Sequence, residues 1–592
     1  MLVLFLAPLF CLVALTSAAT SDYHESLLLQ PLPQSSLLAS FNFQSNSSQE
    51  AFNKRNFRYF PRALGQLLQH AHTKELHLRF TTGRWDDESW GSRPWNGTKE
   101  GATGVELWAW IDASDDEEAF ARWITLTQSL SGLFCASLNF IDSTRTTRPV
   151  ASFQPTGDHA SPSNLHLLHG TLPGEVVCTE NLTPFLKLLP CKGKAGVSSL
   201  FDGHKLFDAS WQSMSVDVRP ICPLPDDCLV QIEQTVDIIL DIDRSTRPRD
   251  NPIPRPIPAD QLVCDSSKSY HSDDTCYPLE KTSEKGWSLS EVFGRSVSGA
   301  CPLAEGSDTS EETICLRVPH EREVSASPNA IEVKKTDGFS RCYTLRPSSP
   351  FDLLLTEQEV TTQIPMNEPV LRAERTIVGH GQERGGMRII FENPSDSEAA
   401  DFIYFESLPW FLRPFVHTLQ ATIIGKDGVH QQVPAAQFIK ETFYRPAVDR
   451  ERGTQLELAL SIPAASTVTL TYDFEKAVLR YTEYPPDANR GFNVAPAVIK
   501  IRGDNQDTPV YIRTTSLLLP LPTPDFSMPY NVIILTSTVI ALAFGSIFNL
   551  LVRRFVTVEE AEAVAAQTVK GRLLGKIVAL RDRIKGKGSK KD

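Results

Sequence analysis

One apolar run near the C-terminus constrains this chain more than any other feature. The run extends from Val532 to Val552 without an ionisable side chain and is closed by Arg553 and Arg554. About 20 mostly apolar residues are enough for an α-helix to cross the hydrocarbon core of a bilayer. A buried helix of this length in a soluble domain would normally carry charged residues on its outer face. The run therefore predicts a single transmembrane helix.

The flanking segments predict the orientation of this helix. The tail at 553–592 is rich in lysine and arginine, and basic flanks stay on the cytosolic side. At the other end, Leu2 to Leu15 is apolar and is followed by small residues, which is typical of a signal peptide at 1–19. Both features predict a type I single-pass membrane protein whose bulk lies outside the cytosol.

Charge and cysteine content limit the classes of partner. The chain has 592 residues, a formal net charge of −13 and 11 cysteines, of which Cys11 falls in the signal peptide. This length predicts two or three domains, and most remaining thiols are expected to pair in an oxidising compartment. The negative charge disfavours a nucleic-acid partner, because phosphate binding needs a concentrated basic surface. No cysteine spacing indicates zinc. Neither a metal nor another cofactor is expected.

Three sequons lie in the part of the chain that is expected to be translocated. They predict N-linked glycans on Asn46, Asn96 and Asn181.

Hydropathy patterns predict the elements of the first half. Alternation at 75–80, 105–110 and 235–242 predicts strands, and helical spacing over Glu117 to Leu130 predicts one helix against a half-buried sheet. A proline-rich stretch at 244–258, followed by a cysteine-rich region, predicts an insertion or linker held by disulfides.

The second half is also β-rich. The alternating segments 456–462 and 468–474 predict a hairpin with one buried face within a β-sandwich. The predicted fold class is mainly β with some α, with β-sandwich-like domains and one C-terminal transmembrane helix. The predicted boundaries are an N-terminal β-rich domain at 20–243, a Pro/Cys-rich insertion or linker at 244–365, a second β-sandwich at 366–519, an extended proline-stiffened juxtamembrane strap at 520–531, the transmembrane helix at 532–552 and a basic cytosolic tail at 553–592 with one amphipathic helix over Val558 to Ile584.

Catalytic motifs are missing from the sequence. There is no HExxH and no P-loop, and Gly294 to Ser298 misses the GxSxG pattern by one position. We therefore expect a binding or scaffolding role and no active site in this chain.

Four longer segments are similar to one family. They are FCASLNFIDST (Phe134 to Thr144), EVVCTENLTPFLKLLPC (Glu175 to Cys191), YTEYPPDANRGF (Tyr481 to Phe492) and LPTPDFSMPYNVI (Leu521 to Ile533). These segments and the predicted topology resemble the PIG-T subunit of the glycosylphosphatidylinositol (GPI) transamidase, in a fungal-type form. The resemblance covers nearly the whole chain, and 244–365 matches least.

The resemblance implies a function in the endoplasmic-reticulum membrane. The complex cuts a C-terminal signal from precursor proteins and attaches a GPI anchor in its place. In this family a caspase-like cysteine-protease subunit carries the nucleophile, and the PIG-T subunit is a non-catalytic scaffold that stabilises that subunit and helps to position GPI lipid and precursor protein. The alternatives are a β-sandwich receptor or cargo adaptor of the secretory pathway and a membrane-tethered hydrolase.

The resemblance also implies an intermolecular disulfide. Cys178 matches the family cysteine that is bonded to the protease subunit, and the alternative is an internal disulfide with Cys191. If Cys178 is bonded outside the chain, we expect Cys135, in an apolar setting, to be a free thiol.

Polar residues near the predicted membrane helix are candidates for GPI binding. Asp525, Ser527 and Asn531 belong to the strap, and Asn489 belongs to the DANRGF turn. Such side chains at headgroup depth can form hydrogen bonds with sugar hydroxyls and with ammonium groups. The alternative is that Asp525 and Asn531 cap the helix and that Asn489 only forms a turn.

Overall fold

The structure is a computed structural model in which the chain forms two compact units, residues 1–522 and residues 523–592, each described here by itself. The residues described are 22–159, 164–224, 227–247, 258–264, 276–279, 283–304, 313–328, 330–347, 349–359, 364, 366–379, 381–485, 487–501, 508–523 and 527–587.

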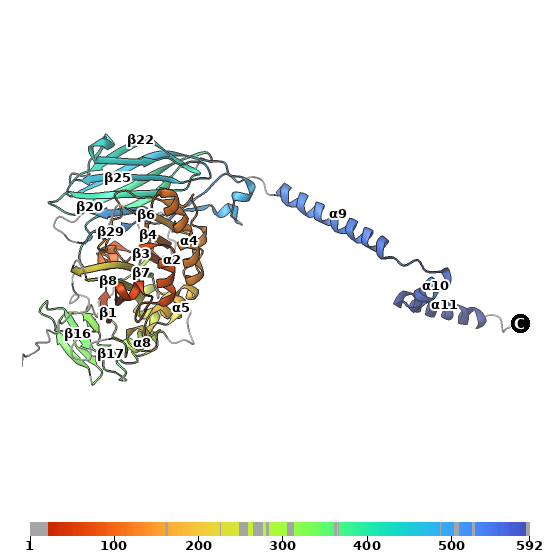
Figure 1. Cartoon of the computed structure of the whole chain (residues 1–592), viewed down its shortest axis with the longest axis horizontal. Coiled ribbons are helices and arrows are strands. Elements are labelled where there is room, and N and C mark those ends of the chain that lie inside the picture. The colour runs from red at the N-terminus through yellow and green to blue at the C-terminus, as the bar shows by residue number, and fades with distance from the viewer. Residues whose placement is uncertain are drawn as a thin grey trace, which may run out of the picture. The chain divides into compact units, whose positions relative to one another are not determined.

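A large mixed sheet forms the N-terminal half of the first unit (Figure 1). Its eleven strands, in spatial order, are β15 (Ile331–Lys334), β16 (Ser340–Thr344), β13 (Ile314–Arg317), β1 (Asp22–Leu32), β2 (Ser36–Ser48), β8 (Asp227–Asp241), β7 (Trp211–Leu224), β3 (Thr73–Thr82), β4 (Gly104–Asp112), β6 (Leu165–Leu172) and β5 (Thr146–Thr147). Three of these strands come from the region after residue 243. β13 pairs in parallel with β1, and a disulfide joins Cys315 of β13 to the facing Cys342 of β16.

Helices cover one face of this sheet. They are α2 (Arg62–His70), α4 (Asp116–Phe134) and α5 (Thr179–Leu188). The predicted helix over 117–130 is confirmed as part of α4, which Asp115 caps by accepting hydrogen bonds from the N–H groups of Glu117 and Glu118. Its buried face includes Ala119, Trp123, Leu126, Leu130 and Phe134, a spacing of three or four residues.

The prediction that this sheet is half-buried is wrong. Nearly every residue of β3 and β4 is buried, because a second layer covers the face opposite the helices. Trp108 and Trp110 of β4 pack there with Phe153, Phe405 and Val498 in a separate apolar cluster.

The second layer is a β-sandwich at 372–519. One sheet has the order β19 (Arg372–Val378), β20 (Arg384–Asn393), β26 (Ser466–Lys476), β22 (Leu412–Ile424) and β23 (His430–Val433), and the other has the order β24 (Ile439–Arg445), β25 (Thr454–Ile462), β21 (Ala400–Leu408), β28 (Val498–Ile501) and β29 (Val510–Arg513). The mainly β fold class with some α is confirmed.

The predicted hairpin between 456–462 and 468–474 is wrong. Both strands exist, but β25 pairs with β21 and β24, whereas β26 pairs with β20 and β22. The short connection therefore crosses from one sheet to the other. Alternation reports which face of a strand is buried and not which strand lies beside it, and both strands bury their apolar faces in the same core.

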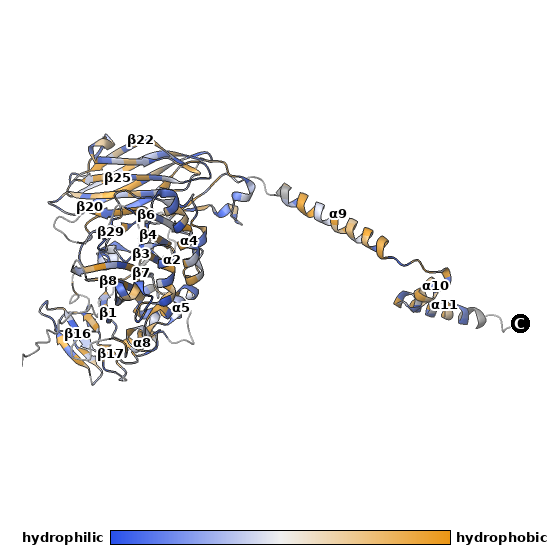
Figure 2. Cartoon of the chain, in the orientation of Figure 1, coloured by the Kyte–Doolittle hydropathy of each residue, from blue (hydrophilic) through white to orange (hydrophobic). Residues whose placement is uncertain are grey.

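The second unit consists of helices. α9 (Ser527–Val552) contains a stretch, Tyr530–Val552, that is long and apolar enough to cross a membrane, and Figure 2 colours most of it as hydrophobic. The tail has two helices, α10 (Val558–Gln567) and α11 (Val569–Lys587), in place of the single helix predicted over 558–584. The break occurs at Thr568, whose backbone is extended and whose hydroxyl accepts a hydrogen bond from the N–H of Gly571.

Candidate functional site

Disulfide pairing leaves two thiols in the described part of the chain. The four bonds are Cys191–Cys301, Cys222–Cys228, Cys264–Cys276 and Cys315–Cys342. Cys135 and Cys178 are free. Because Cys191 is bonded to Cys301, the alternative bond between Cys178 and Cys191 is not formed. Cys135 is exposed and does not lie in the apolar setting that we expected.

The two free cysteines belong to adjacent helix ends. Cys178 is the N-cap residue of α5, and Cys135 is the C-cap residue of α4, in the left-handed conformation at φ 52°. The side chain of Asn181 joins them. Its Oδ1 accepts a hydrogen bond from the N–H of Cys178 at 2.9 Å, and its Nδ2 donates to the carbonyls of Phe134 and Cys135 at 3.0 and 3.3 Å. This amide fixes the position of Cys178 relative to α4.

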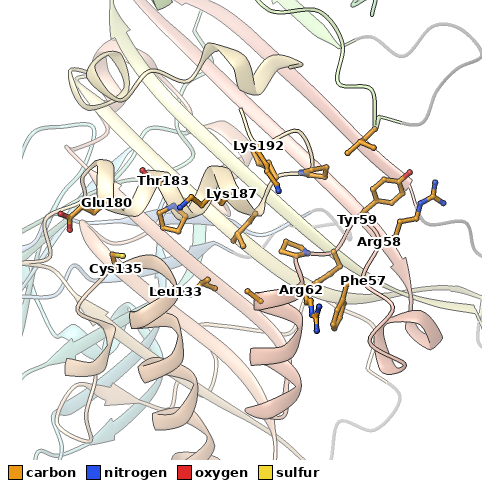
Figure 3. Close-up of a pocket in the computed structure, with 18 residues that line it drawn as sticks. Phe57, Arg58, Tyr59, Arg62, Leu133, Cys135, Glu180, Thr183, Lys187 and Lys192 are labelled. Carbon is orange, nitrogen blue, oxygen red and sulfur yellow. The ribbon is translucent and has the colours of Figure 1, made fainter. Parts of the chain in front are cut away.

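A groove of about 910 Å³ lies beside these cysteines (Figure 3). One wall carries Lys187 of α5 and Lys192. The other carries Arg58, in the segment before α2, and Arg62, the first residue of α2. We name it the basic groove; Cys135 also lines it. The four cations come from two stretches distant in sequence, 58–62 and 187–192, so no single charge run indicates that they share one surface.

Three of the four segments that resemble the PIG-T subunit meet at a second pocket, of about 700 Å³. Phe140 comes from the first segment, Glu175 from the second, and Tyr484 and Phe492 from the third. The N–H of Ser137, in the first segment, donates to Glu175 at 2.8 Å. These segments are far apart in the sequence, and the fold brings them together.

Two further residues of this pocket were not predicted. The guanidinium carbon of Arg450 lies 4.7 Å from the centre of the Trp410 ring, and the same guanidinium pairs with Glu483. No motif links these three positions in the sequence, since the sandwich brings them together.

Asn489 lies on an exposed turn next to this pocket. It belongs to a short helical turn, Ala488–Arg490, that leads directly into β27 (Phe492–Val494). β27 pairs with β30 (Leu517–Leu519), and the Tyr484 hydroxyl donates a hydrogen bond to the carbonyl of Pro522. The turn is therefore held against the last strand before the chain reaches α9. Within the described part of the chain, the Asn489 side chain has no hydrogen-bond partner.

The extended strap predicted at 520–531 is wrong from Ser527 onward, because α9 begins there. Proline is tolerated in the first turn of a helix, where its missing N–H has no partner in any case, and this explains why Pro529 does not prevent the helix. Asn531 is the fifth residue of α9 and is exposed, so it is not a helix cap. Asp525 lies outside the described residues.

The three sequons differ in accessibility. Asn96 is exposed, whereas Asn46 and Asn181 are only 9% and 2% exposed. A glycan on Nδ2 of Asn181 would leave this atom one N–H in place of two, so at least one of the two hydrogen bonds that it donates would be lost. The folded structure therefore disfavours Asn181 as an acceptor and is compatible with Asn96.

Buried ion pairs join the sheet to the sandwich. Glu106 of β4 accepts from Arg513 of β29 at 2.7 Å and from the N–H of Ala102 at 2.8 Å, and its other oxygen lies 3.0 Å from Nε2 of His169. Burial alone would raise the pKa of Glu106, but the charge of Arg513 and the hydrogen bonds from His169 and Ala102 outweigh burial and lower this pKa to about 2. These groups stabilise the contact between the layers.

The hydrogen bonds of Glu457 on β25 reinforce this contact. Its carboxylate accepts from the backbone N–H groups of Val150, Ala151 and Ser152 at 2.7 to 3.0 Å. Among the described residues, no group of three or more His, Cys, Asp or Glu side chains is placed to hold a metal ion.

Comparison with known proteins identifies the family. A sequence model of the family described as "Gpi16 subunit, GPI transamidase component" matches residues 7–578. The chain is 40% identical over 588 residues to "GPI transamidase component GPI16" of Saccharomyces cerevisiae, which covers 95% of this chain and 93% of that protein. It is 35% identical over 553 residues to "GPI transamidase component PIG-T homolog" of Schizosaccharomyces pombe, covering 91% and 92%. It is 33% identical over 570 residues to "GPI-anchor transamidase component PIGT" of Homo sapiens, covering 90% of each. The chain therefore belongs to the Gpi16 family of GPI transamidase components and is closer in sequence to the yeast members than to the human one.

Proposed function

We propose that this chain is the non-catalytic scaffold subunit of a GPI transamidase in the endoplasmic-reticulum membrane. It spans the membrane once in type I orientation, with its first unit in the lumen. There it stabilises a caspase-like cysteine-protease subunit and helps to position GPI lipid and precursor protein. Family membership supports a role within the complex.

The free thiol of Cys178 is the observation that carries the proposal. Eight described cysteines are paired within the chain, and Cys178 is left unpaired and partly exposed at the start of α5. An accessible thiol that stays unpaired in an oxidising compartment is a candidate for an intermolecular bond. The hydrogen bonds of Asn181 hold the backbone of Cys178 in a fixed place, which favours a specific bond over a random one.

A non-reducing gel of the purified complex tests this bond. We expect a covalent species that contains this chain and the protease subunit in the wild type. It should be absent in Cys178→Ser and present in Cys135→Ser, the matched control. A covalent species that survives Cys178→Ser would contradict the proposal. The complex itself should remain assembled, since non-covalent area and not one bond carries most of the affinity in stable interfaces.

The GPI headgroup is the second ligand that we propose. Asn489 in the first unit offers an exposed amide without a partner among the described residues. In the second unit, positions 527 and 531 are four residues apart in α9 and so share one face of the helix. Asp525 completes the set of proposed GPI-binding residues.

We expect the double change Asp525→Ala with Asn531→Ala, and separately Asn489→Ala, to reduce GPI co-purification and surface display of GPI-anchored proteins. Complex assembly should be normal, because Asn489 and Asn531 are exposed and belong to no apolar core. The matched control is Asn367→Ala, since Asn367 is also exposed. Unchanged GPI recovery, or a complex that dissociates, would count against lipid binding by these residues.

A further inference from the structure

The basic groove has a charge opposite to that of the chain as a whole. Four cations line it, Arg58, Arg62, Lys187 and Lys192, and Glu180 is the one carboxylate among the lining residues. All four cations are exposed, in a chain with a formal net charge of −13. Within the described part of the chain, Arg62, Lys187 and Lys192 have no ion-pair partner. Their charges are available to an anionic ligand.

The groove also presents apolar surface. Leu133 at the end of α4 and Phe57 are partly exposed, and Leu303 is 44% exposed. The Cys191–Cys301 disulfide holds the loop that carries Lys192 beside the segment that carries Leu303. The groove is therefore built from elements that are already fixed in place. Binding an apolar side chain there costs little conformational entropy of the groove.

The start of α2 adds to the positive potential. Its N-cap position is Pro61, which makes no side-chain hydrogen bond to the helix, and Pro61, Arg62 and Ala63 all line the groove. The first N–H groups of the helix thus lack a side-chain cap and lie at the groove wall. They carry the positive end of the helix dipole.

The groove comes within two residues of Cys178 along the chain, because Glu180 lines it. Glu180, Thr183 and Lys187 line the groove from α5, the helix that Cys178 begins. Nine residue steps along the helix lead from Cys178 to Lys187, a rise of about 14 Å. A polypeptide bonded to Cys178 covers that distance with about four extended residues.

We propose that the basic groove docks an acidic segment with an apolar anchor, and that this segment belongs to the protein bonded to Cys178. This inference rests on the proposed function and adds the surface and the chemistry of the contact. Acidic side chains of the segment face Arg62, Lys187 and Lys192, and its anchor contacts Leu133 and Leu303. Because the groove lies so near the proposed covalent attachment point in the chain, a polypeptide is favoured over a lipid headgroup as its ligand.

The test removes the covalent bond and then changes the groove. In full-length chain carrying Cys178→Ser, the groove variant is Arg62→Glu with Lys187→Glu. The matched control is Arg384→Glu with Arg388→Glu on β20, because these arginines are also exposed and make no ion pair within the described part of the chain. The readout is the protease subunit that co-purifies in mild detergent, washed at low and at moderate salt.

We expect the groove variant to retain about fivefold less protease than the control at low salt, since two attractions become two repulsions. Retention by the control should fall as salt rises, because exposed charges are screened over about 10 Å at 0.1 M salt. A second variant, Lys192→Glu alone, should give a smaller loss in the same direction.

The outcomes separate the docking proposal from the proposed function. A bond that depends on Cys178, together with equal retention by groove variant and control, would overturn the docking proposal alone. If the groove variant retains as much protease as the control but binds more weakly to vesicles that contain anionic lipid, the groove is a membrane contact. That result would also overturn the docking proposal. Failure of wild-type chain to co-purify any cysteine protease would overturn the proposed function and the docking proposal together.

Discussion

At the scale of residues, the contact between the sheet and the sandwich depends on buried charges that satisfy one another. Glu106 and Arg513 are nearly inaccessible, and His169 completes the set. Such a pair adds little net stability compared with apolar side chains of similar size, but removing one partner leaves a charge buried without compensation. The geometry of the contact between the layers is therefore sensitive to single substitutions.

We expect Glu106→Gln to lower the free energy of unfolding by about 3 kcal/mol, because Arg513 then stays buried without a countercharge. The control is Asp401→Asn. Asp401 pairs with Lys440 at 2.8 Å, but both side chains are about half exposed, so its loss should cost at most about 1 kcal/mol. Denaturant unfolding of both variants gives the comparison.

The pH dependence of the same carboxylate has a defined sign. The pKa of Glu106 is lowered from 4.5 to about 2 in the folded state. The contribution of this ionised carboxylate to the free energy of unfolding is complete above pH 4.5 and is lost as the pH falls toward 2. The stability difference between wild type and Glu106→Gln should shrink in this window. A difference that stays constant from neutral pH to pH 2 would contradict this assignment.

At the scale of elements, single strands and helices were predictable but their partners were not. The patterns at 75–80 and 105–110 correspond to β3 and β4, and 117–130 lies within α4. These features depend on local periodicity. The pairing of β25 and β26 with different sheets depends on contacts distant in sequence, which alternation does not encode.

The candidate site was predictable only where one residue carries the information. Resemblance drew attention to Cys178 and Asn489 by short matching segments. The basic groove depends on Arg62, Lys187 and Lys192 converging from a helix start, a helix end and a loop. Each of these cations alone is an ordinary surface residue, so no one-dimensional pattern identifies the groove.

We expect the Cys191–Cys301 disulfide to contribute more stability than Cys222–Cys228. The first closes a loop between residues 110 positions apart and the second between residues 6 positions apart. Loop-closure entropy predicts about 5 kcal/mol and about 2 kcal/mol respectively. Thermal unfolding of Cys191→Ala with Cys301→Ala, compared with Cys222→Ala with Cys228→Ala, measures both. A smaller shift for the first pair would show that the loop around Lys192 is held by other contacts.

At the scale of the whole molecule, the first compact unit ends a few residues before α9 begins. Leu519 and Leu521 are buried in the core of the sandwich, with 0% and 7% exposure. The fold therefore includes the chain up to the end of this unit at Pro522. We expect this unit to fold independently, because it contains its own apolar cores and disulfides.

A chain cut after Pro522 should fold and be secreted, because it keeps β30 and both cores. A chain cut after Ser516 should be less stable, because it loses the buried Leu519 and Leu521 at about 2 to 5 kcal/mol each. Secretion and thermal unfolding compare the two. Neither should restore GPI attachment in cells that lack the full chain. Full rescue by the longer form would show that partners can replace the membrane helix.

The strand that follows the Asn489 turn, β27, pairs with β30, the last strand before Pro522. Five Cα-to-Cα steps separate Pro522 from Ser527, and so the chain between them can span at most about 18 Å. A short stretch of chain therefore joins the strand that pairs with β27 to the start of α9. Under the proposed function, a lipid that binds at this turn arrives by lateral diffusion in the membrane plane and not by encounters from bulk solution. Inserting flexible residues between Pro522 and Ser527 should lower the effective concentration of the Asn489 turn at the bilayer surface. Every contact within the first unit should stay the same.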